Sequence, residues 1–298
     1  MTAPTVTILV TAYQEAATIG CALEALLPQA GGAELIVICP DEETAAAARV
    51  YPGVEVLHDP GEGKPTALNL GLSRARGDIV VLTDGDVYVG EGALPALLAP
   101  FADPQTGAVS GRAISLNPRD DMLGYWSHLL TEAGADAERL KRDEAGQFFV
   151  ASGYLYAVRA ALVGHIPEDA LAEDAVVSHR VGEQGYRVRY APAARVFVKY
   201  PTTYADWLRQ KVRSAGGYAQ PVIARSPLRM RSFRDEAVAG TARALRYPRT
   251  PREFLWTLAL FAARVHLWLL ILWQGRLPPV PLGGLWAPGG PTQERGGT

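Results

Sequence analysis

Short apolar runs alternate with segments of helical spacing through residues 6–83, and this alternation limits the possible folds more than any other feature. Each run is continuous, as in strands that are buried on both faces. The repeated strand–helix order predicts an α/β fold with a mostly parallel sheet and helices on both faces. We expect strands at Val6–Val10, Leu35–Cys39, Val54–Leu57 and Ile79–Thr83, and helices at Ile19–Leu27, Thr44–Val50 and Lys64–Arg76.

Polar clusters follow three of these expected strands, at Thr11–Glu15, Pro40–Glu42 and Asp84–Asp86. In a doubly wound sheet, ligands bind at the carboxyl ends of the strands. The three clusters therefore predict a ligand site at this edge. Further along the chain we expect helices at Leu123–Arg142 and Asp169–Glu183, strands at Phe148–Val158 and Tyr186–Val198, and helix again from Tyr204.

The expected strand at residues 79–83 ends in two carboxylates, Asp84 and Asp86, separated by one glycine. Paired negative charge at the end of a buried strand is costly unless a cation neutralises it. Hard oxygen ligands of this kind suit Mg²⁺ or Mn²⁺, which also bridge to substrate phosphates. The alternative interpretation is an ordinary acidic turn after a strand.

A second acidic pair, Glu173-Asp174, lies near the start of a predicted helix. Asp174 could act as a general base toward an attacking hydroxyl. An acid favoured by the helix macrodipole is the alternative. The cationic and amide groups of Trp207–Arg213 could face a diphosphate or a sugar, with a basic helix face as the alternative. Lys64, which follows a glycine-rich turn, could contact a phosphate or a base.

Charge is distributed unevenly along the chain. Residues 1–198 hold 14 Lys/Arg against 26 Asp/Glu, a net charge of −12, whereas residues 199–252 hold 12 against 3, a net charge of +9. The basic block directly precedes the most apolar stretch, which favours lipid headgroups over nucleic acid as its partner. A solvated pair of arginine-rich helices is the alternative.

Phe254–Trp273 is long enough to cross the hydrocarbon layer of a membrane, which takes about 20 residues. Arg264 lies near its midpoint and makes insertion marginal, at a cost of about 2.5–3.5 kcal/mol. We expect membrane association, with spanning left open and a buried helix as the alternative. The two cysteines form no metal-binding spacing, and the first residues show no signal peptide, so a reducing, intracellular setting is expected.

Taken in order, these segments resemble the family 2 glycosyltransferases, which have the Rossmann-like GT-A fold. Val6–Glu15 resembles the opening strand and turn of that family, and Gly63–Gly71 resembles its GKxxALNxG segment. Thr83–Asp86 stands at the place of the DxD motif, Glu173-Asp174 matches the ED pair, and Gln210–Arg213 matches most of QxxRW. The resemblance covers about two-thirds of the chain, and the spacing from ED to QxxR is closer to the synthase-like branch.

This resemblance implies an inverting enzyme that moves a sugar from a nucleotide diphosphate donor, preferably a UDP-sugar, to an acceptor hydroxyl. Asp174 would be the base beside Glu173, and Asp86 with Asp84 would hold Mn²⁺ or Mg²⁺. The nucleotide-sugar would contact Thr11, Tyr13, Glu15, Asp41, Lys64, Asp84, Gln210 and Arg213.

Two departures from the family pattern limit the type of transfer that we expect. Only Asp41 of the usual Asp-Asp pair is present, and Ser214 replaces the tryptophan of QxxRW, which disfavours polymer synthesis. We therefore expect single transfer to a lipid-linked or other membrane-held glycan acceptor at the cytoplasmic face of the membrane. The alternatives are a sugar-phosphate nucleotidyltransferase and a non-catalytic sugar-nucleotide-binding protein. The expected regions are a catalytic domain at 1–217, a basic helical region with the apolar helix at 218–276, and a disordered tail at 277–298.

Overall fold

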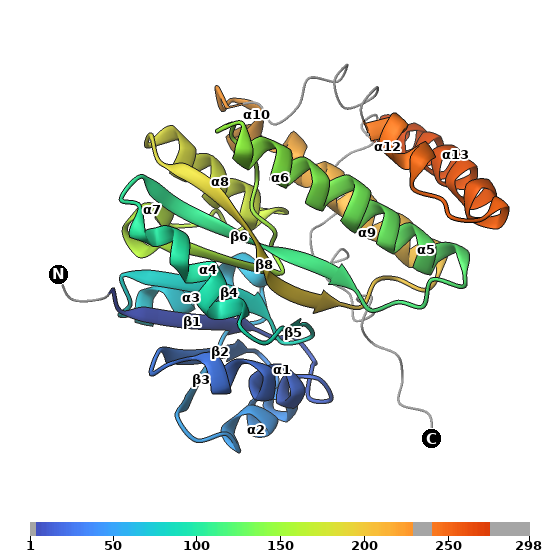
Figure 1. Ribbon diagram of the computed structural model, residues 1–298. Helices are drawn as coiled ribbons and strands as arrows, with labels where there is room; N and C mark the ends of the chain where they lie inside the picture. Colours follow the sequence, from blue (N-terminus) through green and yellow to red (C-terminus); the bar gives the residue numbers. More distant parts are fainter. Residues whose placement is uncertain (1–3, 229–239, 275–298) are drawn as a thin grey trace.

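The computed structural model describes residues 4–228 and 240–274. Its centre is an 8-stranded sheet with the strand order β3-β2-β1-β4-β7-β6-β8-β5. Helices pack on both faces of this sheet, as the alternation predicted (Figure 1). The tail expected at residues 277–298 lies outside the described residues, as do parts of the region 218–276.

The first half of the sheet is parallel and agrees with the prediction. Strands β1, β2 and β4 are buried on both faces, so that Ile8, Val37 and Val81 have no solvent exposure, whereas the edge strand β3 is only partly buried. Helices α1 and α2 pack on one face, and α3 packs on the other. The elements are β1 (Val6–Thr11), α1 (Ile19–Leu26), β2 (Glu34–Cys39), α2 (Glu42–Arg49), β3 (Val54–His58), α3 (Lys64–Arg74) and β4 (Ile79–Asp84).

The second half of the sheet is mixed. It contains β5 (Tyr88–Val89), β6 (Thr106–Ser115), β7 (Leu155–Arg159) and β8 (Arg187–Val198). Strand β7 pairs antiparallel with both β4 and β6, while β6 pairs parallel with β8. The strand expected at Phe148–Val158 was too long. Only Leu155–Arg159 pairs with neighbouring strands, and residues 148–154 form no strand.

Strand β6 escaped the sequence prediction because its residues are weak strand formers. Its glycines reflect close packing: a Cβ on Gly107 would lie 2.6 Å from Val181 Cγ1, and one on Gly111 would lie 2.9 Å from the Ala194 carbonyl oxygen. The strand therefore depends on tertiary contacts with β7 and β8 more than on local preference.

Helix α8 (Glu173–Glu183) begins at the acidic pair, four residues later than expected. The preceding backbone is held in a turn, because Ala170 N donates to Pro167 O over 3.0 Å and Leu171 N donates to Gln220 Oε1 over 2.9 Å. The acidic pair thus lies in the first turn of the helix. The other short elements are η1 (Leu27–Gln29), α4 (Ala93–Leu98), η2 (Ala99–Ala102), α7 (Ala160–Val163) and α10 (Pro221–Ala224).

A long helix replaces the single α-helix expected at Leu123–Arg142. It consists of α5 (Met122–His128), the π-helical segment η3 (Leu129–Asp136) and α6 (Ala137–Glu144). Asp121 Oδ1 caps its start by accepting from Gly124 N over 2.7 Å. The helix position was therefore predicted, but the π-helical turn was not. Such turns are frequent at functional sites.

The C-terminal helices α12 (Thr241–Arg246) and α13 (Pro251–Gln274) pack beside α5 and α9 (Tyr204–Ala219) (Figure 1). Polar contacts anchor them: Tyr125 Oη lies 2.6 Å from Thr257 Oγ1, and Trp126 Nε1 donates to Trp256 O over 2.7 Å. Their shared core consists of Tyr125, Trp126, Leu129, Trp207, Ala244, Leu260 and Ala263.

The other face of α13 is apolar and exposed. Leu255 is 64% exposed, Leu269 is 60% exposed and Trp273 is 62% exposed. Residues Pro251–Ile271 have a mean hydropathy of 1.8, which is high enough, with their length, for a helix that crosses a membrane. The helix thus packs on the domain along one side and presents apolar side chains on the other.

Candidate active site

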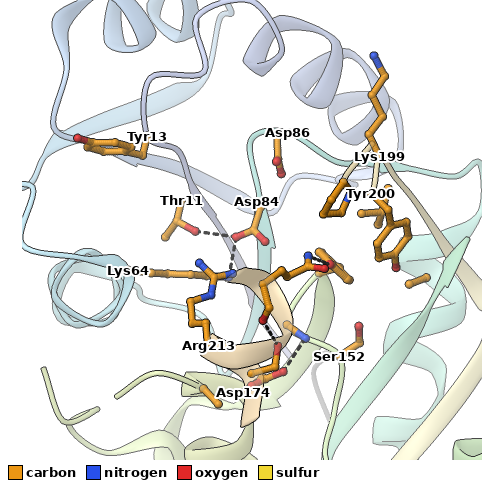
Figure 2. Close-up of a pocket in the computed structure, with 18 of the residues that line it drawn as sticks. Thr11, Tyr13, Lys64, Asp84, Asp86, Ser152, Asp174, Lys199, Tyr200 and Arg213 are labelled. Carbon is orange, nitrogen blue, oxygen red and sulfur yellow. Dashed lines mark hydrogen bonds and ion pairs between the residues drawn. The ribbon is translucent and has the colours of Figure 1, made fainter. Parts of the chain in front are cut away.

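A cleft of about 980 Å³ opens at the carboxyl ends of the parallel strands, where the sequence predicted a ligand site. It lies between the turn after β1, the end of β4, the start of α8 and one face of α9 (Figure 2). Of the expected site residues, the structure brings together Thr11, Tyr13, Glu15, Lys64, Asp84, Asp86, Glu173, Asp174, Gln210 and Arg213.

Lys64 joins the two acidic motifs. Its Nζ lies 2.7 Å from Asp84 Oδ1 and 2.8 Å from Glu173 Oε1, and all three side chains are largely buried. The residue starts α3, directly after Gly63 with its left-handed φ of 118°. Burial alone would lower the pKa of Lys64, but the two carboxylates hold it well above its usual value, so the ammonium stays charged.

The end of β4 lies beside the end of β1, with Thr11 opposite Asp84 in the register. Thr11 Oγ1 donates to Asp84 Oδ1 over 3.0 Å (Figure 2). The pKa of the Asp84 carboxyl is raised above its usual value. Burial is the largest cause and the charge of Asp86 adds to it, while the Lys64 ammonium lowers the pKa. Asp84 therefore gains from any cation that enters the cleft.

Glu15 adds a third carboxyl group to this end of the cleft. Its Oε2 is buried and has no hydrogen-bond partner among the described residues. Burial raises the pKa of Glu15 well above its usual value, and the charges of Asp86 and Asp84 add to this. An unsatisfied buried carboxylate oxygen of this kind marks a position that a ligand or a cation can complete.

The carboxylates of Asp84 and Asp86 fit a divalent cation by their chemistry. Within residues 4–228 and 240–274, no group of three or more metal-binding side chains occurs. Asp84 and Asp86 are hard oxygen donors of the kind that bind Mg²⁺ together with water and substrate phosphates. The donor set therefore matches Mg²⁺ or Mn²⁺ as expected from the sequence.

The two carboxylates at the start of α8, Glu173 and Asp174, lie in different electrostatic environments. Burial would raise the pKa of Glu173, but Lys64 holds it below its usual value. Asp174 has no ion-pair partner among the described residues, and burial and then the Glu173 charge raise its pKa to about 6. Its Oδ2 accepts from Gly153 N over 3.0 Å, which orients the carboxylate toward the cleft (Figure 2). Asp174 can therefore exchange a proton near neutral pH.

Asp41 is the one expected site residue that the structure does not bring to the cleft. Its Oδ1 accepts from Thr44 N and its Oδ2 accepts from Gln14 N, each over 2.9 Å. Asp41 therefore caps α2 and supports the turn after β1, where Gln14 has a left-handed φ of 55°. A turn of this shape requires the support of neighbouring side chains.

Two tyrosines of the cleft were missed by the sequence reasoning. Tyr154 lies in the segment that was expected to be strand, and its ring packs edge-on against Tyr200 at 5.9 Å between centroids. Gln210 Nε2 lies 3.5 Å from Tyr154 Oη. Burial raises the pKa of Tyr154 to about 12, so it remains a neutral hydroxyl. A tyrosine carries no motif signal by itself, which explains the omission.

The far wall of the cleft is formed by the long helix. Side chains from α5, η3 and α6 line it, although no sequence motif places this helix at the site. The lining residues on this side are Leu123, Ser127, Leu130, Thr131, Ala135, Asp136 and Arg139.

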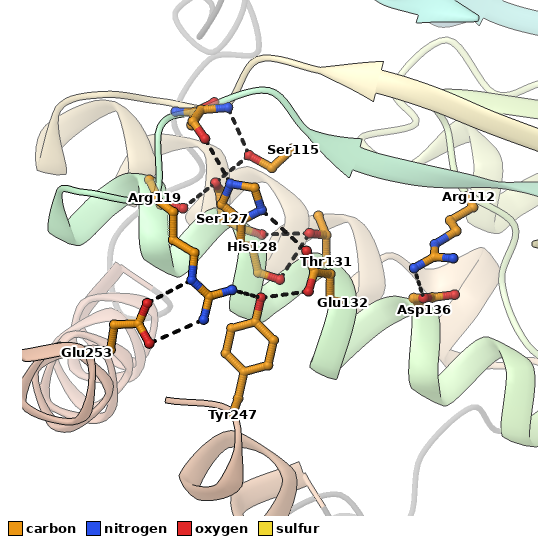
Figure 3. A network of polar contacts seen from close by, with 12 residues as sticks. Arg112, Ser115, Arg119, Ser127, His128, Thr131, Glu132, Asp136, Tyr247 and Glu253 are labelled. Atoms are coloured by element: carbon orange, nitrogen blue, oxygen red, sulfur yellow. Dashed lines mark hydrogen bonds and ion pairs between the residues drawn. The ribbon is translucent and has the colours of Figure 1, made fainter. Parts of the chain in front are cut away.

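The same long helix holds the C-terminal helices through a polar network (Figure 3). Arg119, just before the helix, donates from Nε to Glu253 Oε1 over 2.8 Å and from Nη1 to Tyr247 Oη over 2.7 Å. Tyr247 Oη in turn donates to Glu132 Oε2 of η3 over 2.7 Å. Glu253 lies in the first turn of α13, so this network fixes where the helix starts.

The sequence matches a known family over most of the described domain. The model of the family described as "Glycosyltransferase like family 2" matches residues 3–217. The poly-β-1,6-N-acetyl-D-glucosamine synthase of Staphylococcus aureus is 27% identical over 71% of this chain and 54% of its own length. The pre-mycofactocin glycosyltransferase of Mycobacterium tuberculosis is 30% identical over 69% of this chain and 45% of its own length. The chain thus spans about half the length of these relatives.

Solved structures share the fold. The mannosyltransferase PcManGT of Pyrobaculum calidifontis, in complex with GDP-Man and Mn²⁺, superposes with a TM-score of 0.62 and 24% identity over 96% of this chain and 79% of its own. The mannosyl-3-phosphoglycerate synthase of Rubrobacter xylanophilus gives a TM-score of 0.54 and 18% identity over 77% of this chain and 78% of its own. These likenesses identify the fold as GT-A-like.

Proposed function

Because the chain belongs to glycosyltransferase family 2 and is a glycosyltransferase, we propose that it moves a sugar from a UDP-sugar to an acceptor hydroxyl with inversion. The observation that carries this proposal is the Lys64 ammonium bound to both Asp84 and Glu173, with Asp174 beside them. This arrangement keeps Glu173 ionised as a partner of Lys64 and leaves Asp174 as the only member of the pair suited to proton transfer.

The proposed reaction is a direct displacement. Asp174 takes the proton of the acceptor hydroxyl while the hydroxyl oxygen bonds to the anomeric carbon. The bond from that carbon to the donor phosphate breaks, and its electron pair leaves with the nucleoside diphosphate. No covalent sugar–enzyme intermediate is needed, and the pKa of about 6 for Asp174 suits a base that is ionised at neutral pH.

The leaving diphosphate needs positive charge around it. When bound at Asp84 and Asp86, Mg²⁺ or Mn²⁺ would supply charge neutralisation to the phosphates. Arg213 and Gln210 lie on α9 at the same cleft and are placed to bind the diphosphate or the acceptor. Thr11, Tyr13 and Glu15 would contact the nucleotide at the β1 side. Asp41 holds this turn through Gln14 N and remains a predicted nucleotide contact.

We propose that transfer takes place at the cytoplasmic face of a membrane, on a lipid-linked or other membrane-held acceptor. The exposed apolar face of α13 and the excess of Lys/Arg in residues 199–252 support this. In this proposal residues 1–217 are the catalytic domain and the C-terminal region holds it at the membrane. Single transfer is preferred because Ser214 stands at the tryptophan position of QxxRW.

The decisive measurement is a thermal-shift titration with UDP and GDP, each with and without Mn²⁺. A ligand at 100 times its dissociation constant adds about 2.7 kcal/mol to the free energy of unfolding. We expect a metal-dependent shift with UDP. A shift with GDP alone would change the donor class, and no shift with either nucleotide would contradict the proposed donor site.

A further inference from the structure

We propose that Arg139 binds an oxyanion of the acceptor, so that the acceptor carries a phosphate or carboxylate close to the hydroxyl that receives the sugar. The inference rests on the proposed function, because it places the acceptor between Arg139 and the base Asp174. It adds a binding residue and a chemical class of acceptor to that function.

Arg139 lies in the first turn of α6, directly after the π-helical segment, and its half-buried side chain lines the cleft. Its Nε donates to the carbonyl oxygen of Val150 over 3.1 Å. This bond fixes one edge of the guanidinium. The two Nη groups form another edge, which can bind a carboxylate or a phosphate in a fork.

The other half-buried arginines of this helix and its neighbours have carboxylate partners. Arg142, three residues further along, lies 2.8 Å from Glu138, and Arg189 lies 2.8 Å from Asp143. In the parts of the chain that the structure describes, Arg139 has no ion pair. A half-buried cation that lines a cleft without an anionic partner is costly, and an incoming anion would remove this cost.

The two carboxylates nearest to Arg139 along the chain, Glu138 and Asp136, already have other partners. Glu138 lies 2.8 Å from Arg142 and 2.9 Å from Arg243. Asp136 Oδ1 accepts from Tyr190 Oη over 2.6 Å. Its Oδ2 lies 2.8 Å from Arg112 Nη2 (Figure 3). Both oxygens therefore serve other partners. Asp136 fixes the start of α6 against β6 and β8, and leaves Arg139 to face the cleft.

Arg139 acts on the base without touching it. The two side chains form no ion pair within 4.0 Å, yet the charge of Arg139 lowers the pKa of Asp174 against the larger effect of burial. Arg139 donates to Val150 O and Asp174 accepts from Gly153 N, so both side chains bind the same short segment that lines the cleft. The acceptor hydroxyl can reach Asp174 while an anionic group a few atoms away reaches Arg139.

The test uses the full-length protein saturated with UDP and Mn²⁺, so that the donor phosphate site is filled. Two probes carry both a hydroxyl and a phosphate: glycerol 3-phosphate in solution, and phosphatidylglycerol in phosphatidylcholine vesicles. We expect Arg139→Gln to weaken binding of one or both probes by at least about tenfold. Arg139→Lys should recover part of the loss, because it keeps the charge but not the fork. Lys141→Gln is the matched control, since Lys141 is exposed on the same helix and does not line the cleft.

The outcomes separate the two proposals. An unchanged UDP shift in Arg139→Gln shows that the variant is folded and that its donor site is intact. Loss of glycerol 3-phosphate binding identifies a soluble type of acceptor, and loss of vesicle binding alone identifies a lipid one. Equal binding of both probes by wild type and Arg139→Gln, or no binding by wild type, overturns the anionic-acceptor inference and leaves the donor site untouched. Absence of any UDP shift in wild type overturns the proposed function instead.

Discussion

Lys64 Nζ lies 2.7 Å from Asp84 Oδ1, and the same ammonium reaches the acidic pair of α8 at Glu173. One buried cation therefore links the end of β4 to the start of α8, two segments separated by nearly ninety residues. The contact keeps negative charges close together at the bottom of the cleft, where burial would otherwise force some of them to bind protons.

Replacing Lys64 with Met should destabilise the protein by about 3–5 kcal/mol, because both carboxylates would stay buried without their cation. Urea unfolding at neutral pH measures this change. Lys64→Arg should lower the free energy of unfolding by less. Lys199→Met, at an exposed position on the same cleft, should leave it almost unchanged. Equal stability of Lys64→Met and wild type would show that the ammonium does not hold the two segments together.

Asp174→Asn should lower kcat by about 10²–10⁴ while leaving UDP binding intact, because an amide cannot accept the acceptor proton. Transfer assays and nucleotide titrations on the same preparation measure the two effects. Asp169→Asn is the matched control, since Asp169 lies just before the helix and is exposed. Full activity of Asp174→Asn would show that another group is the base.

The rate should depend on pH through Asp174. Its pKa is raised to about 6, so the carboxylate is protonated and inactive below this pH and ionised above it. We expect kcat/KM to rise with pH through about 6 and then level off. A pH profile of initial rates, corrected for protein stability, checks the sign. A rate that stays constant down to pH 5 would contradict the role of Asp174.

Asp86→Ala should remove the dependence of UDP affinity on Mn²⁺. The remaining carboxylate, Asp84, is already bound to Lys64 and cannot hold the ion by itself. Isothermal titration with UDP, with and without Mn²⁺, measures the difference. If metal still tightens UDP binding in Asp86→Ala as much as in wild type, the cation is held elsewhere.

Glu253→Gln should loosen the start of α13 by about 1–2 kcal/mol, because Arg119 loses a charged partner while Tyr247 remains. Hydrogen exchange of residues 251–258 should speed up, with little change in the sheet. Glu42→Gln, which removes a surface pair with Arg49, is the control. Unchanged exchange at α13 would mean that the apolar contacts alone position the helix.

The parallel half of the sheet and most of the cleft could be predicted because they depend on local patterns. Apolar runs that are buried on both faces have a clear signal, and polar residues that follow such runs must gather at one edge. Strand β6 gave no such signal, since Gly107 and Gly111 are there to permit close packing and not to form a strand. The first residues of the strand expected at Phe148–Val158 were wrongly predicted as strand. Their apolar side chains are buried, but their backbone does not pair with another strand.

Residue roles were harder to predict than residue positions. Asp41 stands where a nucleotide contact was expected, but its two oxygens are used by backbone N–H groups of the neighbouring turns. Arg139 had no motif to mark it, and its place in the cleft follows only from the packing of the long helix against the sheet. Hydrogen-bond partners and helix packing are tertiary properties, which a linear pattern does not contain.

The long helix from Met122 to Glu144 has two structural roles: some of its side chains line the cleft, and others pack against α13. Because of these two roles, the catalytic domain and the C-terminal helix cannot be exchanged independently of each other. A chimera that exchanged only the C-terminal helix for another anchor would expose Trp126 and leave Arg119 without Glu253. A working hybrid would have to bring its own version of the long helix, and would thereby also exchange the wall against which the acceptor is expected to lie.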